Sequence, residues 1–251
     1  QITPSSVVMN YSSTRNSAEV VSSAQAIAMG TSKDGGLFVP ETIPQMPLEE
    51  IGSLIEENYV QRAEYILAKF LTDFSMDELG YCVRSAYTAE KFGSDKIAEL
   101  ARLGEGTYML ELWHGPTCAF KDMALQLLPY LLTISVQKTI ANKEVVILVA
   151  TSGDTGKAAL EGFKDVEGTR ILVFYPEDGV SPMQKLQMTT QEGENVGVCA
   201  VKGNFDDAQT AVKAMFTDNA LKGELDAKGM MFSSANSINW GRLVPQIVYY
   251  I

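Results

Sequence analysis

Short apolar runs recur along the second half of the chain, each about as long as a single strand. They lie at residues 145–149, 171–175, 196–200 and 230–233. Runs of four to eight apolar and β-branched residues are typical of strands that are buried on both faces of a sheet. The pattern therefore predicts four buried strands.

The segments between these runs carry apolar residues at helical spacing. They lie at residues 156–164, 181–190 and 206–219. Strands and helices that alternate in this way form parallel sheets with right-handed crossovers. We therefore expect an α/β fold over about residues 144–235, with an open parallel sheet and flanking helices. Ligands of such sheets bind at the carboxyl ends of the strands, so the loops that follow the four runs are candidate sites.

The first hundred residues carry mainly helix signals. An Asp-Gly-Gly turn at residues 34–36 leads into the apolar run 37–39, which predicts a short strand. From residue 48 to residue 101, apolar residues stand at helical spacing between charged ones. We expect an α+β N-terminal domain over residues 1–102, followed by a second region over residues 103–251.

Composition narrows the possible functions. The chain has 251 residues, with 20 lysines and arginines against 31 aspartates and glutamates, and a net charge of −11. General binding of nucleic acids or anionic membranes needs clustered basic residues, so we expect neither partner. No run reaches the roughly 18 apolar residues of a membrane helix. Three cysteines without paired spacing predict no disulfide framework and no metal site, and a cytoplasmic location fits them best.

Lys121 is the foremost candidate for chemistry. It follows Phe120 at the start of the nearly apolar segment 123–132, so we expect its amine to lie close to buried surface. Burial lowers the pKa of an amine and leaves it nucleophilic. Such a lysine can form a Schiff base with a carbonyl, most commonly that of pyridoxal phosphate. The alternative is a surface lysine paired with Asp122.

The loop after the first predicted strand has the features of an anion site. Residues 151–156 read Thr-Ser-Gly-Asp-Thr-Gly and lead directly into a predicted helix. Helix starts present unpaired N–H groups, and glycines let a ligand approach the backbone closely. The alternative is an ordinary N-cap formed by Ser152, Asp154 or Thr155.

A second candidate anion site follows the last predicted strand. Polar residues at 233–237 precede a helix on which Asn239 and Arg242 share one face near the positive end. An arginine there can form two parallel hydrogen bonds with a phosphate. The alternative is an N-cap followed by a solvated arginine. The only histidine, His114, is expected to pack or hydrogen-bond beside the lysine segment and not to act as a base.

Several motifs, in their order along the chain, match one family. They are Asn-Tyr at 10–11 with Ser-Thr-Arg at 13–15, Asp-Gly-Gly-Leu-Phe-Val-Pro at 34–40, Trp-His-Gly-Pro-Thr at 113–117, Phe-Lys-Asp at 120–122, Thr-Ser-Gly-Asp-Thr-Gly at 151–156, and Asn-Ser-Ile-Asn-Trp-Gly-Arg at 236–242. Together they resemble threonine synthase. The first two resemble the N-terminal domain of its long form, which fungi and bacteria have.

The resemblance implies a pyridoxal phosphate enzyme of the second fold type, similar to tryptophan synthase β chains. It implies a carbon–oxygen lyase of threonine biosynthesis in the aspartate-family pathway, which converts O-phospho-L-homoserine and water to L-threonine and phosphate. The implied partners are therefore that small substrate and pyridoxal 5′-phosphate. The sequence leaves open whether the protein is a monomer or a homodimer.

The resemblance also implies a role for each candidate residue. Lys121 would form the Schiff base with the cofactor and move protons at Cα and Cβ of the substrate. The other implied contacts are with the cofactor from Phe120 and Asp154, with the substrate carboxylate from Ser152, Gly153 and Thr155, and with the substrate phosphate from Asn236, Ser237 and Arg242.

Members of the family continue beyond the segment that ends at Ile251. The continuation carries a Gly-Asn-Phe-Gly-type loop for the cofactor phosphate and a hydroxyl partner for the pyridine nitrogen. We therefore expect the N-terminal portion of a longer enzyme, which turns over little or nothing alone. Two alternatives stay open: a serine or threonine dehydratase-like enzyme, and a non-catalytic remnant domain. In the remnant, the apolar end at residues 246–251 would form an exposed patch.

Overall fold

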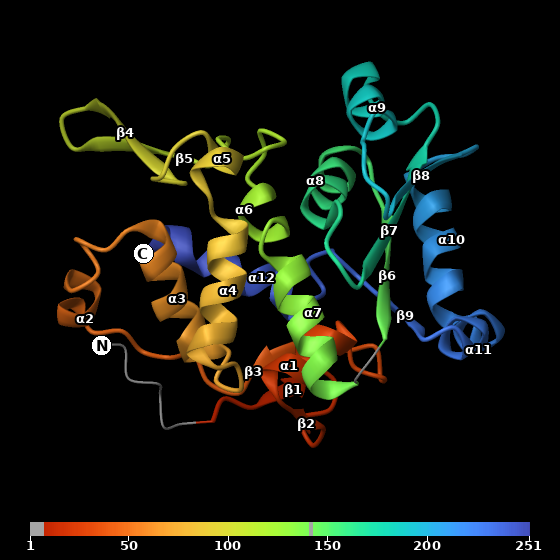
Figure 1. The fold of residues 1–251 in the computed structure, drawn as a ribbon, viewed down its shortest axis with the longest axis horizontal. Helices are drawn as coiled ribbons and strands as arrows, with labels where there is room; N and C mark the ends of the chain where they lie inside the picture. Colours follow the sequence, from red (N-terminus) through yellow and green to blue (C-terminus); the bar gives the residue numbers. More distant parts are fainter. Residues whose placement is uncertain (1–7, 141–142) are drawn as a thin grey trace.

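A computed structural model describes residues 8–140 and 143–251. Figure 1 shows a mainly helical first part of the chain on one side of the molecule and a parallel sheet with its helices on the other. The last segment, drawn in blue, returns to the first part. The first seven residues of the predicted N-terminal domain lie outside the described residues.

The first part combines helices with two small antiparallel sheets. Its elements, up to the second of these sheets, are β1 (Tyr11–Ser13), β2 (Val20–Val21), α1 (Ser23–Met29), β3 (Phe38–Pro40), α2 (Leu48–Gly52), α3 (Tyr59–Phe70), α4 (Met76–Ala86), α5 (Ala89–Phe92), β4 (Glu99–Gly104) and β5 (Thr107–Glu111). β1 lies between β2 and β3, and β4 forms a hairpin with β5. This mixture is the α+β character that the sequence predicts.

Three helices of this part begin at capping boxes. At each start a Ser or Asn side chain accepts a hydrogen bond from the backbone N–H three residues on, and a Gln or Glu side chain accepts one from the N-cap N–H. The pairs are Ser22 with Gln25, Asn58 with Gln61, and Ser75 with Glu78. These side chains satisfy donors that a helix start otherwise leaves unpaired. The starts of α1, α3 and α4 are therefore specified locally.

The helical pattern predicted up to residue 101 was wrong at its end. Residues 99–101 belong to β4, the first strand of the hairpin. Leu100 and Leu103 are three residues apart, as on one face of a helix, but both are exposed. Their spacing does not reflect a buried face, so pairing with β5 determines the local structure.

The second part is the four-stranded parallel sheet that the apolar runs predict, and the expected α/β class is confirmed. Its elements are β6 (Glu144–Ala150), α8 (Asp154–Phe163), β7 (Thr169–Pro176), α9 (Pro182–Thr189), β8 (Val196–Val201), α10 (Phe205–Thr217), α11 (Asn219–Ala227) and β9 (Met230–Ser233). The strand order is β8-β7-β6-β9, and all three pairs are parallel. Figure 1 shows α8 and α10 on opposite faces of this sheet.

Two consecutive helices, α6 (Asp122–Leu125) and α7 (Leu128–Thr139), precede the sheet. Most of their apolar residues, such as Leu131, are buried. α7 packs along α1, and α6 packs against α8. Gly162 of α8 comes so close to the Leu125 carbonyl that a Cβ there would overlap the oxygen. This close approach holds the start of α6 near the loop that precedes α8.

The C-terminal segment forms α12 (Trp240–Leu243) and the 3-10 helix η1 (Val244–Tyr250). η1 packs against α3 and α6. Val248 is buried, and its apolar neighbours are partly buried against the core, although Tyr250 is exposed. The exposed apolar patch anticipated for residues 246–251 in a remnant domain is therefore not formed, because α3 covers most of this segment.

Candidate active site

Lys121 lies where the chain enters α6. Its carbonyl accepts hydrogen bonds from the N–H groups of Ala124 and Leu125, so its backbone belongs to the first helical turn. The side chain is 21% exposed, and its Nζ lies 3.9 Å from Oδ2 of Asp154. The same Nζ lies 4.8 Å from the centre of the Phe120 ring. The structure thus brings together Lys121, Phe120 and Asp154, the three residues that the resemblance assigns to the cofactor.

Asp122 accepts hydrogen bonds from Thr117 and does not pair with Lys121. Its Oδ1 accepts from the Thr117 hydroxyl at 2.6 Å, and its Oδ2 accepts from the Thr117 N–H at 2.9 Å. Burial raises the pKa of Asp122, although the hydrogen bonds from Thr117 oppose this effect. Among the described residues no ion pair joins Asp122 to Lys121. The alternative of a surface Lys121–Asp122 pair was therefore wrong, and Asp122 instead fixes the loop before α6.

His114 packs beside this loop. Its Nε2 lies 2.6 Å from Oε2 of Glu111, at the end of β5. Its ring stacks on that of Trp113, with 4.2 Å between the ring centres and 23° between the planes. These contacts agree with the predicted packing and hydrogen-bonding role.

The loop before α8 is stabilised by Thr151, to which the sequence analysis assigned no separate role. Its hydroxyl oxygen accepts from the N–H groups of Gly153 and Gly156, at 3.0 and 2.9 Å. Gly153 has a φ of +145°, and a Cβ there would overlap the side chain of Gln184. The Gln184 amide donates to Oδ1 of Asp154 at 2.9 Å. Thr151 therefore holds the backbone of the loop, and Gln184 holds the Asp154 carboxylate that faces Lys121.

The start of α8 is capped from the preceding loop. The N-cap residue is Gly153, which has no side chain, and the Thr151 hydroxyl accepts from the Gly156 N–H in the first turn, so the alternative of a cap by Ser152, Asp154 or Thr155 was wrong. Glycine at the N-cap lets a ligand approach the backbone closely at the positive end of the helix dipole. Within the described residues, the hydroxyls of Ser152 and Thr155 have no hydrogen bond. The start of α8 is therefore suited to bind a carboxylate.

Arg242 is a buried cation, not a solvated one. It lies on α12 and is 3% exposed. Its Nε and Nη1 have no hydrogen-bond partner among the described residues. Burial lowers the pKa of Arg242, although arginine keeps its proton in proteins. The alternative of a solvated arginine was therefore wrong, and the buried guanidinium is suited to bind an anion.

The other polar residues of the segment 236–242 do not share the unpaired, buried state of Arg242. Asn239 is the N-cap of α12 and lies before the helix, so the prediction that it shares a helix face with Arg242 was wrong; its amide donates to the Ile27 carbonyl at 3.0 Å. Asn236 and Ser237 are exposed in the loop before the cap. A joint role of these two residues with Arg242 in binding the substrate phosphate stays a prediction.

Three tyrosines near Arg242 were missed by the sequence analysis. Tyr87 and Tyr249 are close enough to influence the pKa of Arg242, and the Tyr59 ring packs edge-on against Tyr87 at 5.0 Å. The Tyr87 hydroxyl donates to the Met123 carbonyl at 2.6 Å, two residues after Lys121. These tyrosines come from the N-terminal helices and the C-terminal segment, and no local pattern connects them to the lysine motif.

Comparison with known proteins shows what the chain is similar to. Residues 10–87 match the family described as threonine synthase N terminus. Over 242 residues the chain is 41% identical to threonine synthase of Pseudomonas aeruginosa. This aligned region covers 96% of this chain and 50% of that protein. The chain is therefore homologous to threonine synthases and carries their N-terminal domain at residues 10–87.

Solved threonine synthases share the fold. The pyridoxal phosphate-bound enzyme from Brucella melitensis matches with a TM-score of 0.86 and 39% identity, over 96% of this chain and 50% of that one. The enzyme from yeast matches with a TM-score of 0.85 and 35% identity, over 96% and 48% of the two chains. The chain thus spans about half the length of the threonine synthases that it matches.

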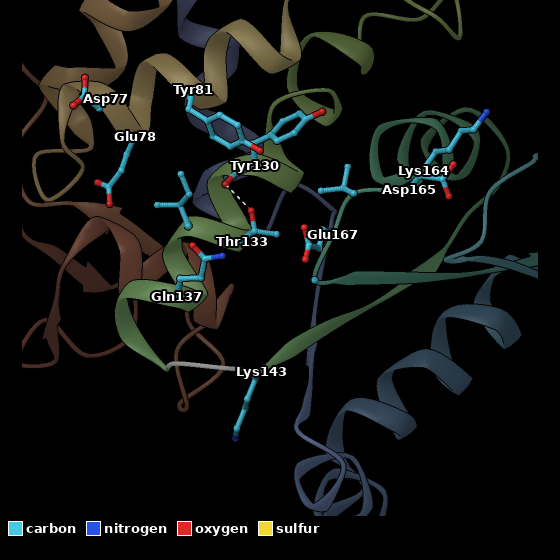
Figure 2. Close-up of a pocket in the computed structure, with 13 residues that line it drawn as sticks. Asp77, Glu78, Tyr81, Tyr130, Thr133, Gln137, Lys143, Lys164, Asp165 and Glu167 are labelled. Atoms are coloured by element: carbon cyan, nitrogen blue, oxygen red, sulfur yellow. Dashed lines mark hydrogen bonds between the residues drawn. The ribbon is translucent and has the colours of Figure 1, made fainter.

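Two cavities of this threonine synthase relative lie away from Lys121. Figure 2 shows one of about 860 Å³, in which the rings of Tyr81 and Tyr130 meet edge-on at 5.9 Å. The other, of about 1010 Å³, lies along β9. Lys121 does not line either cavity, so neither is the predicted active site.

The described residues contain no cluster of three or more His, Cys, Asp or Glu side chains arranged to hold a metal. In the same residues, no helix is long and apolar enough to cross a membrane. Cys82 is buried, whereas Cys118 and Cys199 are exposed, and all three are free thiols.

Proposed function

We propose that this chain carries the lysine-bearing part of a pyridoxal phosphate-dependent threonine synthase. The reaction is the conversion of O-phospho-L-homoserine and water to L-threonine and phosphate. The observation that carries the proposal is the position of the Lys121 Nζ, 3.9 Å from Asp154 at the start of α8, where the N-cap residue is Gly153. The relative from Brucella melitensis, solved with pyridoxal phosphate bound, supports the same cofactor here.

The environment of Lys121 fits an aldehyde cofactor. Its amine is only partly exposed, and 3.9 Å separates it from Asp154, its ion-pair partner among the described residues. No short ion pair has to be broken before the amine reacts. Lys121 would hold the cofactor, with Phe120 and Asp154 beside it. When bound, pyridoxal phosphate supplies an electron sink for the removal of protons next to the amino-acid nitrogen.

The unpaired donors of Arg242 fit a phosphorylated substrate. A buried guanidinium with unpaired Nε and Nη1 groups is unfavourable until an anion accepts from them. Phosphate oxygens match these donors in geometry and charge. Asn236 and Ser237, from the same segment, would add neutral hydrogen bonds. The residues therefore fit a phosphate group.

The protein's own contribution would be orientation and proton transfer. Ser152, Gly153 and Thr155 at the start of α8 would bind the substrate carboxylate, while Arg242 binds the phosphate. A substrate fixed at both ends presents Cα and Cβ to the Lys121 amine, which takes their protons. Phosphate would then leave from Cγ, and water would add its hydroxyl at Cβ. Lys121 would return the two protons to Cγ and Cα, and the remaining proton of the water would leave with the phosphate.

A serine or threonine dehydratase is less compatible with these residues. Its substrate carries no phosphate, so nothing in the substrate would accept from the Arg242 guanidinium. A buried cation that stays unpaired through the whole reaction would weaken the fold without aiding the chemistry. The phosphate-bearing substrate is therefore the better supported one.

Covalent labelling tests the proposal. The chain is incubated with pyridoxal phosphate, reduced with borohydride, and mapped by mass spectrometry. We expect one dominant label on Lys121, lost in Lys121→Ala and retained in Lys157→Ala. Lys157 is a matched control, because it is also partly buried and lies on α8. Label spread evenly over exposed lysines, or an unlabelled Lys121, would contradict the proposal.

A further inference from the structure

A cavity of about 1010 Å³ lies along β9, between the N-terminal part of the chain and the helices α10 and α11. Figure 1 shows β9 between these two helices, in blue, and the red N-terminal strands. Ser233 and Ser234 line the cavity, but Lys121, Asp154 and Arg242 do not. The cavity is therefore separate from the proposed active site.

The ionisable residues of this cavity have the opposite charge to the chain as a whole. They are Arg15, Lys33, Lys143, Lys213, Lys222 and one acidic residue, Asp226. Five basic residues against one acidic residue leave an excess of four positive charges, in a chain of net charge −11. A concave surface lined by one sign of charge focuses the electrostatic potential. This cavity therefore attracts anions.

Three of these lysines are available to bind a ligand. Lys143 pairs with Asp226 across the cavity wall. In contrast, Lys33, Lys213 and Lys222 are exposed and form no ion pair within residues 8–140 and 143–251. An anion that binds them does not have to displace a carboxylate.

The wall between the lysines is apolar. The rings of Phe216 and Phe232 meet edge-on, with 5.6 Å between their centres. Met29, Met230 and Met231 line the same cavity and are only partly buried. Methionine side chains adapt their shape and make favourable contacts with aromatic rings. A flat aromatic group fits this wall.

The hydroxyl of Ser233 provides independent evidence for a ligand. Ser233 lines the cavity and is 2% exposed. Its Oγ is buried and has no hydrogen-bond partner in the described part of the chain. Buried polar groups are nearly always paired, and a ligand oxygen would pair this one.

We propose that this cavity binds a small organic anion that carries an aromatic ring. The ring lies against Phe216 and Phe232, and the charged group lies near Lys213 and Lys222. The cavity in Figure 2 offers a contrast, because four acidic residues and two lysines line it. The excess of acidic residues disfavours the same ligand in that cavity.

The test uses the fluorescent probe 8-anilinonaphthalene-1-sulfonate, which joins a sulfonate to an aromatic system. We expect saturable binding to the folded chain at low salt. The double variant Lys213→Gln, Lys222→Gln should weaken binding by about fivefold or more, because two Coulomb attractions are removed. The difference in probe affinity between the parent and the double variant should shrink at high salt, where exposed charges are screened.

A second variant and a matched control complete the design. Gly223 lines the cavity, and a Cβ there meets no atom within 4 Å, so Gly223→Phe should block the probe while α11 stays folded. The double variant Lys185→Gln, Lys202→Gln removes two charges outside the cavity and should leave binding unchanged. Thermal unfolding checks that each variant is folded. Absence of saturable binding, or equal affinity in all variants, would overturn the proposal.

Discussion

At the scale of single residues, Arg242 shows how a side chain can be placed for a partner outside the protein. Its guanidinium is 3% exposed, and two of its nitrogens have no partner among the described residues. Tyr87 and Tyr249 are its ionisable neighbours, Tyr59 packs on Tyr87, and none of the three supplies a carboxylate. Desolvation of an unpaired ion weakens a fold by several kcal/mol. The free protein should therefore gain stability when an anion binds.

Replacement of Arg242 by methionine tests this argument. Methionine keeps much of the apolar stem and removes the charge, so we expect a free energy of unfolding within about 1 kcal/mol of the parent, or above it. Inorganic phosphate should raise the unfolding temperature of the parent but not of Arg242→Met. Arg84→Met, at an exposed arginine, is the control and should keep the phosphate effect. A loss of several kcal/mol in Arg242→Met without phosphate would refute the account.

Asp122 gives a prediction about pH. Its pKa is raised in the folded protein, so the folded state binds this proton more tightly than the unfolded chain does. Ionisation of Asp122 therefore lowers stability as the pH rises from the ordinary carboxyl range through the raised pKa. Asp122→Asn removes this loss, and its weaker hydrogen bonding to Thr117 lowers the stability of the variant by about 1 kcal/mol at every pH. Urea unfolding of the parent and of Asp122→Asn between acid and neutral pH measures their free energies of unfolding. The stability of the variant relative to the parent should increase as the pH rises.

At the scale of elements, the contact between α6 and α8 helps to place Lys121 relative to Asp154. The two helices approach at Gly162, next to the Leu125 carbonyl. Because α6 begins directly after Lys121 and α8 begins at Asp154, this contact sets the distance between the amine and the start of α8. A change in the contact between α6 and α8 should therefore change the distance between Lys121 and Asp154.

Two glycine substitutions separate close packing from helix propensity. Gly162→Ala places a methyl group against the Leu125 carbonyl, and we expect a loss of about 1–3 kcal/mol in the free energy of unfolding. Gly223→Ala, on α11, meets open space and should stabilise the protein by about 0.5–1 kcal/mol. Denaturant unfolding of both variants checks this contrast. Equal effects would show that the α6–α8 contact is looser than described.

The strands and helices of the sheet were predictable because burial on both faces leaves a strong apolar pattern. The hairpin β4–β5 was not, since its Leu100 and Leu103 are exposed and their spacing imitates a helix. The N-cap of α8 was also misjudged. Ser152 and Thr155 have the right chemistry to cap, but the hydroxyl of Thr151 binds the loop backbone from inside.

At the scale of the whole molecule, the candidate site joins parts that are far apart in the sequence. The start of α6, the loop before α8 and the buried arginine of α12 meet around one region, and tyrosines of the N-terminal helices line the arginine. The sequence motifs identified the three parts. Their burial was not predictable, because Tyr59 and Tyr87 carry no signal that links them to Arg242.

The packing of η1 should matter for the whole chain. Val248→Asp places a charge where η1 meets the core, and we expect a loss of about 3 kcal/mol or more in the free energy of unfolding. Tyr250→Asp, at a residue that is 77% exposed, should change stability by less than about 0.5 kcal/mol. Thermal and denaturant unfolding measure both variants. Similar stabilities of the two variants would argue against the described packing of η1.

The central claim is that Lys121 and Arg242 serve one ligand. It is tested most directly by titration of the pyridoxal phosphate-loaded chain with O-phospho-L-homoserine, followed through the absorption of the bound cofactor. We predict a saturable spectral change in the parent chain, and the same change in Arg242→Met only at concentrations about 100-fold higher, the loss typical of a buried bidentate contact. Identical titration curves for the two proteins would contradict the claim.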